Sequence, residues 1–151
     1  MDMKTKVNEI QVSYCEKTSI FQAPPMKSSR DVARLLYDNW DTDTIGLRET
    51  FKILLLNNSN KVKGIYPLSI GGITGTMVDL RILYALVLKS LSTAIILAHN
   101  HPSGKLRPSE ADRAVTVKIK KAGQLFDITI LDHLIISPNG GYYSFKDNGL
   151  L

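Results

Sequence analysis

Cysteine is almost absent from this sequence of 151 residues, in which Cys15 stands alone. A single cysteine cannot form a disulfide within the chain, and such scarcity suits a reducing compartment. Cys15 ends an alternating run over residues 10–15 that has no histidine near it in sequence. We therefore predict that Cys15 is an ordinary strand residue and not a nucleophile.

Long apolar segments are also lacking. The longest runs, such as residues 94–98, are far shorter than the ~20 residues that a membrane-spanning helix requires. Residues 1–9 are polar and no apolar stretch follows them, so we expect no targeting signal. These features predict a cytoplasmic protein with no membrane partner.

Positive charge is in only modest excess, and the formal net charge is +5. This excess is small for a dedicated nucleic-acid binder, and the few aromatic residues are spread out along the chain. Much of the positive charge gathers in one stretch, at Lys105, Arg107, Arg113, Lys118, Lys120 and Lys121. We interpret this stretch as a solvated helix side and its loop, with at most weak, sequence-independent contact to nucleic acid.

The overall amino-acid composition is typical of one globular domain. Hydrophobic residues make up 44% of the chain and charged residues 22%, and 151 residues are enough to bury a core. We assign residues 1–28 to an N-terminal strand and loop of the same domain that residues 29–151 form.

Apolar periodicity and turn residues predict the order of elements along the chain. Helices are expected at 30–39, from 79 onward, and from 109 to 123; strands are expected at 9–15, 51–57, 61–67, 93–98, 128–136 and 142–145. Residues 93–98 are almost wholly apolar, which is typical of a central strand buried on both faces. The mixture indicates an α/β fold, a sheet with helices packed on its faces.

The helix expected at 109–123 carries two further predictions. Ser109 fits its N-terminal cap, and Gly123 fits its C-terminal end. The side expected to face the core consists of Ala111, Ala114, Val115, Ile119 and Ala122.

The strongest chemical signal is a pair of histidines at the end of the buried strand, followed by an aspartate. His99 and His101 are two residues apart, so in extended backbone they point to the same side. Asp112 falls in the first turn of the next helix. Two imidazoles and one carboxylate suit Zn²⁺ with a fourth position open to water, which is the pattern of catalytic zinc sites.

A structural explanation covers part of this motif. Ser109 and Asp112, three residues apart, also fit a helix capping box. Capping does not explain two histidines at a strand end, and metal binding by His99, His101 and Asp112 explains all three residues.

The same residues resemble a known family. His99-x-His101, seven residues, Ser109, two residues and Asp112 match the JAMM motif of the JAB/MPN metalloproteases, and residues 99–104 with Pro108-Ser109 look like the core of RadC-like proteins. The likeness runs from about residue 49 to residue 145. It implies a cytidine-deaminase-like α/β sandwich with a mixed β-sheet. It does not extend to the helix-hairpin-helix domain that RadC-like proteins often carry.

The resemblance also implies a mechanism, in which zinc activates a water that cleaves a peptide or isopeptide bond. Glu49 matches the family's upstream glutamate, which acts as the general base. Ser109 matches the serine that donates a hydrogen bond to the oxyanion. Because Lys105-Leu106-Arg107 is basic where the family's loop is usually acidic and polar, the family's substrate preference is not carried over.

His133 and Asp132 lie next to each other in the apolar strand expected at 128–136. Alternation along a strand puts their side chains on opposite faces of the sheet. Each is explained as a core residue bonded to a neighbour, or as a partner that orients a metal ligand. Direct ligation by either residue is not expected.

Three functions are compatible with these residues. A JAMM-type peptidase acting on a peptide or protein explains most of them. A nucleic-acid-associated module with a structural or vestigial metal is the alternative, based on the basic stretch. A zinc deaminase is disfavoured because that class uses a Cys-x-x-Cys pair and this chain has one cysteine.

Overall fold

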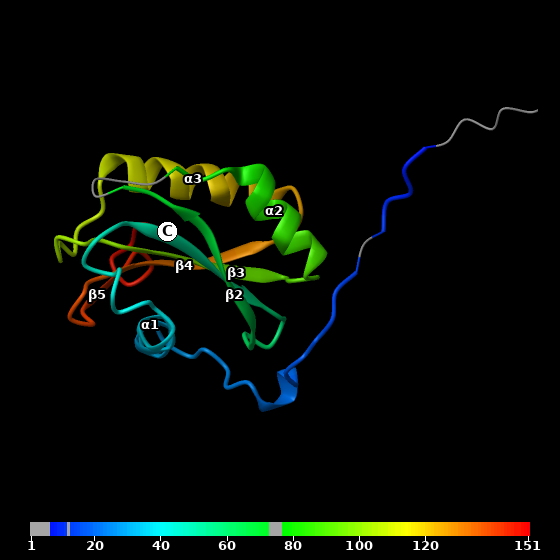
Figure 1. Cartoon of the computed structure of the whole chain (residues 1–151), viewed down its shortest axis with the longest axis horizontal. Coiled ribbons are helices and arrows are strands. Elements are labelled where there is room, and N and C mark those ends of the chain that lie inside the picture. The colour runs from blue at the N-terminus through cyan, green and yellow to red at the C-terminus, as the bar shows by residue number, and fades with distance from the viewer. Residues whose placement is uncertain (1–6, 12, 73–76) are drawn as a thin grey trace, which may run out of the picture.

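A five-stranded sheet organises the chain (Figure 1). The computed structural model of the protein describes residues 7–11, 13–72 and 77–151. The strands are β1 (Thr50–Leu56), β2 (Val62–Ile70), β3 (Ala94–Asn100), β4 (Thr129–Ile136) and β5 (Tyr142–Ser144). The helices are the short 3₁₀ turn η1 (Ile20–Gln22) and the α-helices α1 (Ser29–Asp38), α2 (Leu80–Lys89) and α3 (Glu110–Gln124).

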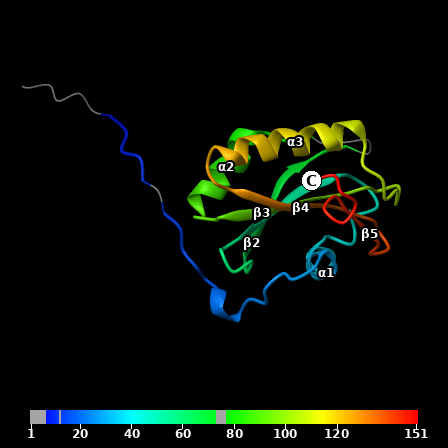
Figure 2. The same ribbon diagram turned by 180° about the vertical axis from the view of Figure 1, so that it is seen from behind.

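The sheet is mixed, as the resemblance implied. Its strand order is β2-β1-β3-β4-β5, with β3 and β4 parallel and the other neighbours antiparallel. Helix α1 covers one face, and helices α2 and α3 cover the other (Figures 1 and 2). All seven residues of β3 are buried, which confirms the prediction of a central strand.

Alternation along β1 shows how the two faces are filled. Leu54 packs with Leu36 of α1, whereas its neighbour Ile53 packs with Leu83 of α2 and Ile119 of α3. The apolar residues of β1 thus contribute in turn to one or the other of two apolar cores. The sheet is held between them as the middle layer of a sandwich.

Side-chain caps fix where the three α-helices begin. The side chains of Ser28, Asp79 and Ser109 each accept a hydrogen bond from a backbone N–H in the first turn. These caps satisfy donors that have no partner within the helix. The predicted helix starts near residues 30, 79 and 109 are confirmed. None of the helices in the described residues is long and apolar enough to cross a membrane.

The strand predicted at 9–15 is wrong. The described residues of that stretch form no strand, Ile10 is 83% exposed and Cys15 is exposed. Figure 1 shows the segment running away from the sheet. An alternating pattern makes a strand only where a partner edge is available, and this segment pairs with none. The assignment of residues 1–28 to the domain stays a prediction; an isolated bridge joins Pro25 to Lys61, the residue before β2.

Two details of α3 also differ from expectation. Ala111 and Ala114 are exposed, and the buried positions are Thr116, Ile119 and Gly123. Gly123 lies inside the helix and does not end it. An added Cβ there would lie 2.8 Å from the Ile128 carbonyl oxygen, so the glycine is required by close packing against the chain that follows.

Candidate metal centre

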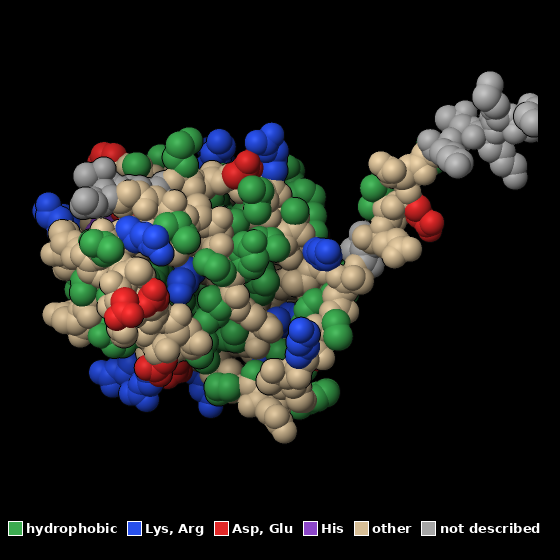
Figure 3. Space-filling view, in the orientation of Figure 1, with side chains coloured by type: hydrophobic (Ala, Val, Ile, Leu, Met, Phe, Trp, Pro, Cys, Tyr) green, Lys and Arg blue, Asp and Glu red, His purple; other side chains and the backbone are tan. Residues whose placement is uncertain are grey.

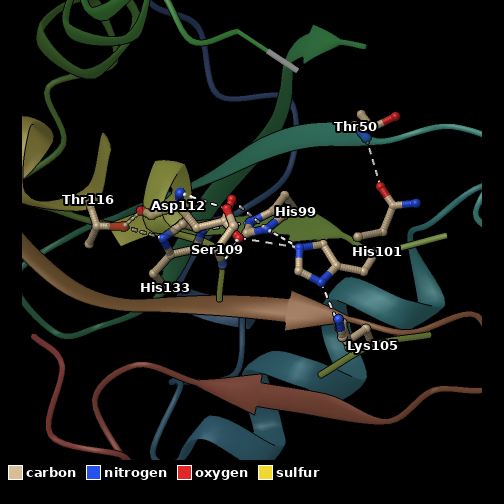
Figure 4. A network of polar contacts seen from close by, with 9 residues as sticks. Thr50, His99, His101, Lys105, Ser109, Asp112, Thr116 and His133 are labelled. Atoms are coloured by element: carbon tan, nitrogen blue, oxygen red, sulfur yellow. Dashed lines mark hydrogen bonds and ion pairs between the residues drawn. The ribbon is translucent and has the colours of Figure 1, made fainter. Parts of the chain in front are cut away.

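The end of β3 and the start of α3 bring the predicted metal ligands together. His99 belongs to β3 and His101 follows it, after which a turn reverses the chain toward Ser109. Gly104 has a φ of +79°, a conformation that favours glycine in this turn. Figure 4 shows Asp112 and Ser109 beside the two histidines.

The distances among the three predicted ligands suit a tetrahedral metal site. The Nε2 atoms of His99 and His101 are 3.0 Å apart, and they lie 3.3 and 3.4 Å from the two carboxylate oxygens of Asp112. Zinc bonds of ~2.0–2.2 Å in a tetrahedral site place ligand atoms about 3.3–3.6 Å apart. The two nitrogen–oxygen distances fall in this range and the nitrogen–nitrogen distance is about 0.3 Å shorter, so the donor set and its spacing are close to those of a tetrahedral metal site.

Solvent can reach this cluster from one side. The His99 side chain is 1% exposed, whereas those of His101 and Asp112 are 15% and 14% exposed. A metal held here would be anchored in the core and open toward the surface. Such a site leaves room for a water or a substrate oxygen, as catalytic sites require.

Glu49 lies next to the ligands. One ligand atom of each of Glu49, His99, His101 and Asp112 can be chosen so that all lie within 4.8 Å of one another. The backbone of Glu49 exchanges hydrogen bonds with the far end of the hairpin, donating to Gly72 at 3.1 Å and accepting from Gly71 at 2.8 Å. Residues 49 and 112, distant in sequence, thus face one centre.

The ionisable groups of the cluster attract positive charge. Burial works to raise the pKa of Asp112, but its polar contacts with His101 and His99 outweigh it and lower that pKa. Burial works to lower the pKa of His101, but its bonds to Asp112 and Lys105 raise that pKa overall. For Glu49, burial raises the pKa and the neighbouring histidines only partly oppose it. A metal ion would supply the positive charge that this cluster favours.

Ser109 performs the capping role expected of it. Its hydroxyl oxygen accepts from the Asp112 N–H at 3.1 Å, and an Asp112 carboxylate oxygen accepts from the Ser109 N–H at 2.8 Å. The same carboxylate faces both histidines, so the capping box also orients a predicted metal ligand. Ser109 is exposed, and its hydroxyl proton is not used by the cap.

Asn100, between the two histidines, was assigned no role from the sequence. Its side chain is fully buried and points to the opposite face. Its oxygen accepts from the Thr50 N–H at 2.7 Å, and its amide donates to the carbonyls of Ile45 and Arg48 at 2.7 and 2.9 Å. Asn100 thereby ties the segment that carries Glu49 to the strand that carries His99. The signal in the sequence that could have indicated this role is a polar residue beside His99 at the end of an apolar strand.

His133 and Asp132 take opposite faces of β4, as predicted. His133 is fully buried, and its Nε2 lies 2.8 Å from Nδ1 of His99. Asp132 accepts from the Ser144 hydroxyl at 2.6 Å and from the Lys146 N–H at 3.0 Å. Asp132 thus fixes the C-terminal segment, and only His133 contacts a predicted ligand.

The basic residues do not share one side of α3. Successive helix residues turn by about 100°, so Lys118 and Lys120 lie on opposite flanks of the buried Ile119. Lys118 lines a hollow with Met77, and Lys120 lines another with Asp127. Figure 3 shows the lysine and arginine side chains of one face in separate places, without a continuous patch.

Fold and site together are those of the JAB/MPN class, a mixed-sheet sandwich with histidines and carboxylates at one centre. Residues 26–150 match the family model described as the RadC-like JAB domain, and the chain belongs to this family.

Curated relatives agree with this assignment. A "UPF0758 protein" of Flavobacterium johnsoniae is 55% identical over 102 residues, which are 68% of this chain and 44% of that protein. A UPF0758 protein of Porphyromonas gingivalis is 41% identical over 131 residues, covering 86% of this chain and 58% of the relative. The chain thus spans about half the length of the curated relatives it matches. Their names state no activity.

Proposed function

We propose that this protein is a zinc-dependent hydrolase of the JAMM type that cleaves an amide bond, in a peptide or isopeptide substrate. The observation that carries the proposal is the convergence of His99, His101 and Asp112 at close to tetrahedral spacing, with the carboxylate of Glu49 alongside.

In this proposal the two Nε2 atoms and the Asp112 carboxylate hold the metal. The His101 Nδ1 lies 2.6 Å from the Lys105 carbonyl oxygen, which can only accept, so the proton of a neutral His101 is on Nδ1 and Nε2 is free to bind. Bound zinc supplies Lewis acidity, which lowers the pKa of a water at its open position toward neutrality.

The other two predicted residues handle protons and developing charge. Glu49 accepts the proton of the attacking water and delivers it to the leaving amine. Burial raises the pKa of Glu49, which makes it a stronger proton acceptor than an exposed carboxylate. Ser109 donates its free hydroxyl proton to the oxyanion of the tetrahedral intermediate while its oxygen remains in the helix cap.

Metal content of the purified protein tests the site. We expect about one zinc per chain by elemental analysis and loss of that zinc in His101→Ala, because each of the three ligands is needed. Glu110→Ala is the matched control, since Glu110 is an exposed acid in the same helical turn as Asp112. Full zinc occupancy in His101→Ala would contradict the assignment.

Activity requires a separate assay with a panel of peptides and isopeptide-linked peptides. Cleavage that is lost on chelation and restored by zinc supports a hydrolase. A protein that holds zinc, cleaves no member of the panel and binds nucleic acid would favour the alternative, a nucleic-acid-associated module. The separated positions of Lys118 and Lys120 argue against that alternative.

A further inference from the structure

A buried chain of polar side chains leads from the metal centre into the core. It runs from His99 through His133 to Thr116, with contacts of 2.8 Å and 2.6 Å, and ends on the backbone carbonyl of Asp112 at 2.6 Å (Figure 4). His99, His133 and Thr116 are 1%, 0% and 3% exposed, so bulk solvent does not reach these groups. Their hydrogen bonds must therefore be made with other groups of the protein.

The position of each proton along this series of side chains follows from the Asp112 carbonyl at which the series ends. The Asp112 carbonyl oxygen can only accept, so the Thr116 hydroxyl donates its single proton there. Thr116 must then accept from Nδ1–H of His133, which leaves Nε2 of a neutral His133 without a proton. That Nε2 accepts from Nδ1–H of His99. The Nε2 of His99, which faces His101 and Asp112, is left with a free lone pair.

We infer that Thr116 and His133 are positioning residues that hold His99 in the tautomer able to bind a metal. The inference rests on the metal site of the proposed function. It does not depend on the substrate. The opposite order of protons would place a hydrogen on Nε2 of His99, where the metal would bind. It would also leave the 2.6 Å contact between Thr116 and the Asp112 carbonyl without a hydrogen.

The rings around His133 hold it in the required orientation. Phe145 stacks on it with ring centroids 4.4 Å apart, and Phe51 meets it edge-on at 5.5 Å. Phe51 also stacks on His99, at 6.0 Å. Packing therefore fixes the orientation of both imidazoles. The hydrogen bond to Thr116 then selects the tautomer of His133 and, through it, that of His99.

A pair of substitutions at position 116 separates tautomer control from packing. Thr116→Val keeps the shape and removes the hydroxyl, whereas Thr116→Ser keeps the hydroxyl and removes a methyl group. We expect Thr116→Val to weaken zinc binding about 10- to 100-fold, the usual effect of losing a group that supports a ligand. Thr116→Ser should bind zinc nearly as the parent does. Competition with a chromophoric chelator measures both.

His133→Phe provides a second variant, because phenylalanine keeps a ring between Phe145 and Phe51 but cannot accept from His99. We expect a similar loss of zinc affinity in a protein that still unfolds cooperatively. Equal zinc affinity in the parent, Thr116→Val and His133→Phe would overturn the inference.

Nitrogen NMR of the histidine rings reads the tautomers directly, with and without zinc. We expect the proton of His133 on Nδ1 in the parent and in Thr116→Ser, and its shift toward Nε2 in Thr116→Val. A parent protein with the His133 proton on Nε2 would refute the inference even if the protein binds no metal. A parent that binds zinc with the expected tautomer yet cleaves nothing would leave the inference standing and contradict only the hydrolase.

Discussion

Single residues at this centre serve the fold and the site at once. Asp112 closes a helix cap through the Ser109 N–H while its two oxygens face His99 and His101. Its orientation is therefore fixed before any ligand arrives, which reduces the entropy lost on binding. Glu49 differs, because its side chain has no capping role and its burial raises its pKa. Substitution of Glu49 should thus affect chemistry with little effect on folding.

Glu49→Gln tests that separation. Glutamine keeps the size of the side chain and removes the proton acceptor, so we expect hydrolysis to fall by about 100-fold or more while zinc content is retained. Turnover of a responsive peptide and elemental analysis measure the two quantities. Ser109→Ala is the informative comparison, because it should lower turnover and also cost about 1 kcal/mol of stability through the lost cap. Parent-like turnover in Glu49→Gln would show that Glu49 takes no part in the mechanism. Loss of zinc from Glu49→Gln would show instead that Glu49 is a metal ligand.

Between elements, the position of Glu49 depends on Asn100. The three hydrogen bonds of the Asn100 side chain join β3 to the backbone at residues 45, 48 and 50. His99 and His101 are held independently, by the pairing of β3 with β1 and by the bond from the His101 N–H to the Ile136 carbonyl. Loss of the Asn100 bonds should therefore displace the base more than the metal ligands.

Asn100→Asp tests this connection. The aspartate keeps an acceptor for the Thr50 N–H but turns a second oxygen toward two carbonyl oxygens in a buried position. We expect the free energy of unfolding to fall by at least about 2 kcal/mol. In the protein that remains folded, hydrolysis should fall while zinc is kept. Asn58→Asp in the exposed hairpin turn is the control, and an equal effect there would contradict the role of Asn100.

In helix α3, the change in stability on Gly123→Ala shows whether helix propensity or steric crowding dominates at that position. Alanine is a better helix former than glycine by up to about 1 kcal/mol, so propensity alone predicts that Gly123→Ala stabilises the protein. The added Cβ would lie 2.8 Å from the Ile128 carbonyl oxygen and 2.9 Å from the Tyr84 hydroxyl. We expect this crowding to dominate and to cost about 1–3 kcal/mol in chemical denaturation. Gln124→Ala at the exposed neighbour should change stability by less than about 0.5 kcal/mol.

Local signals explain which of these features the sequence could predict. Helix caps and the buried strand β3 depend on neighbouring residues, so their positions follow from the pattern of residues. The side of α3 was misjudged at Ala111 and Ala114 because alanine is small enough for either environment. The partners of Asn100 lie about 50 residues away in sequence, and Thr116 meets His133 only across the fold. No local pattern reports such contacts, so the sequence did not indicate the roles of Asn100 and Thr116, whereas support of a metal ligand was one of the two roles expected for His133.

At the scale of the whole molecule, the two cores hold the sheet without the first part of the chain. The core residues come from 32 onward, with Met26 packed against the α1 side. In the described part of residues 1–19, the Tyr14 ring lies 4.4 Å from the Lys63 ammonium. A cation–π contact at an exposed position is worth about 0.5–1 kcal/mol. The metal centre lies on the other side of the sheet from α1, and the four residues that form it come from outside this segment.

Two truncations test how much the N-terminal segment contributes. Removal of residues 1–19 should lower the free energy of unfolding by no more than about 1 kcal/mol and leave zinc content unchanged, since the exposed Tyr14–Lys63 contact made by its described residues is worth no more than that. Removal of residues 1–27 should cost more, because it also deletes Met26, whose N–H donates to the Asn60 carbonyl at 3.0 Å and whose side chain packs on the core. Chemical denaturation and elemental analysis of both proteins provide the comparison. If the shorter deletion already unfolds the domain, then residues 1–19 belong to its folded unit and the predicted assignment of 1–28 to one domain gains support.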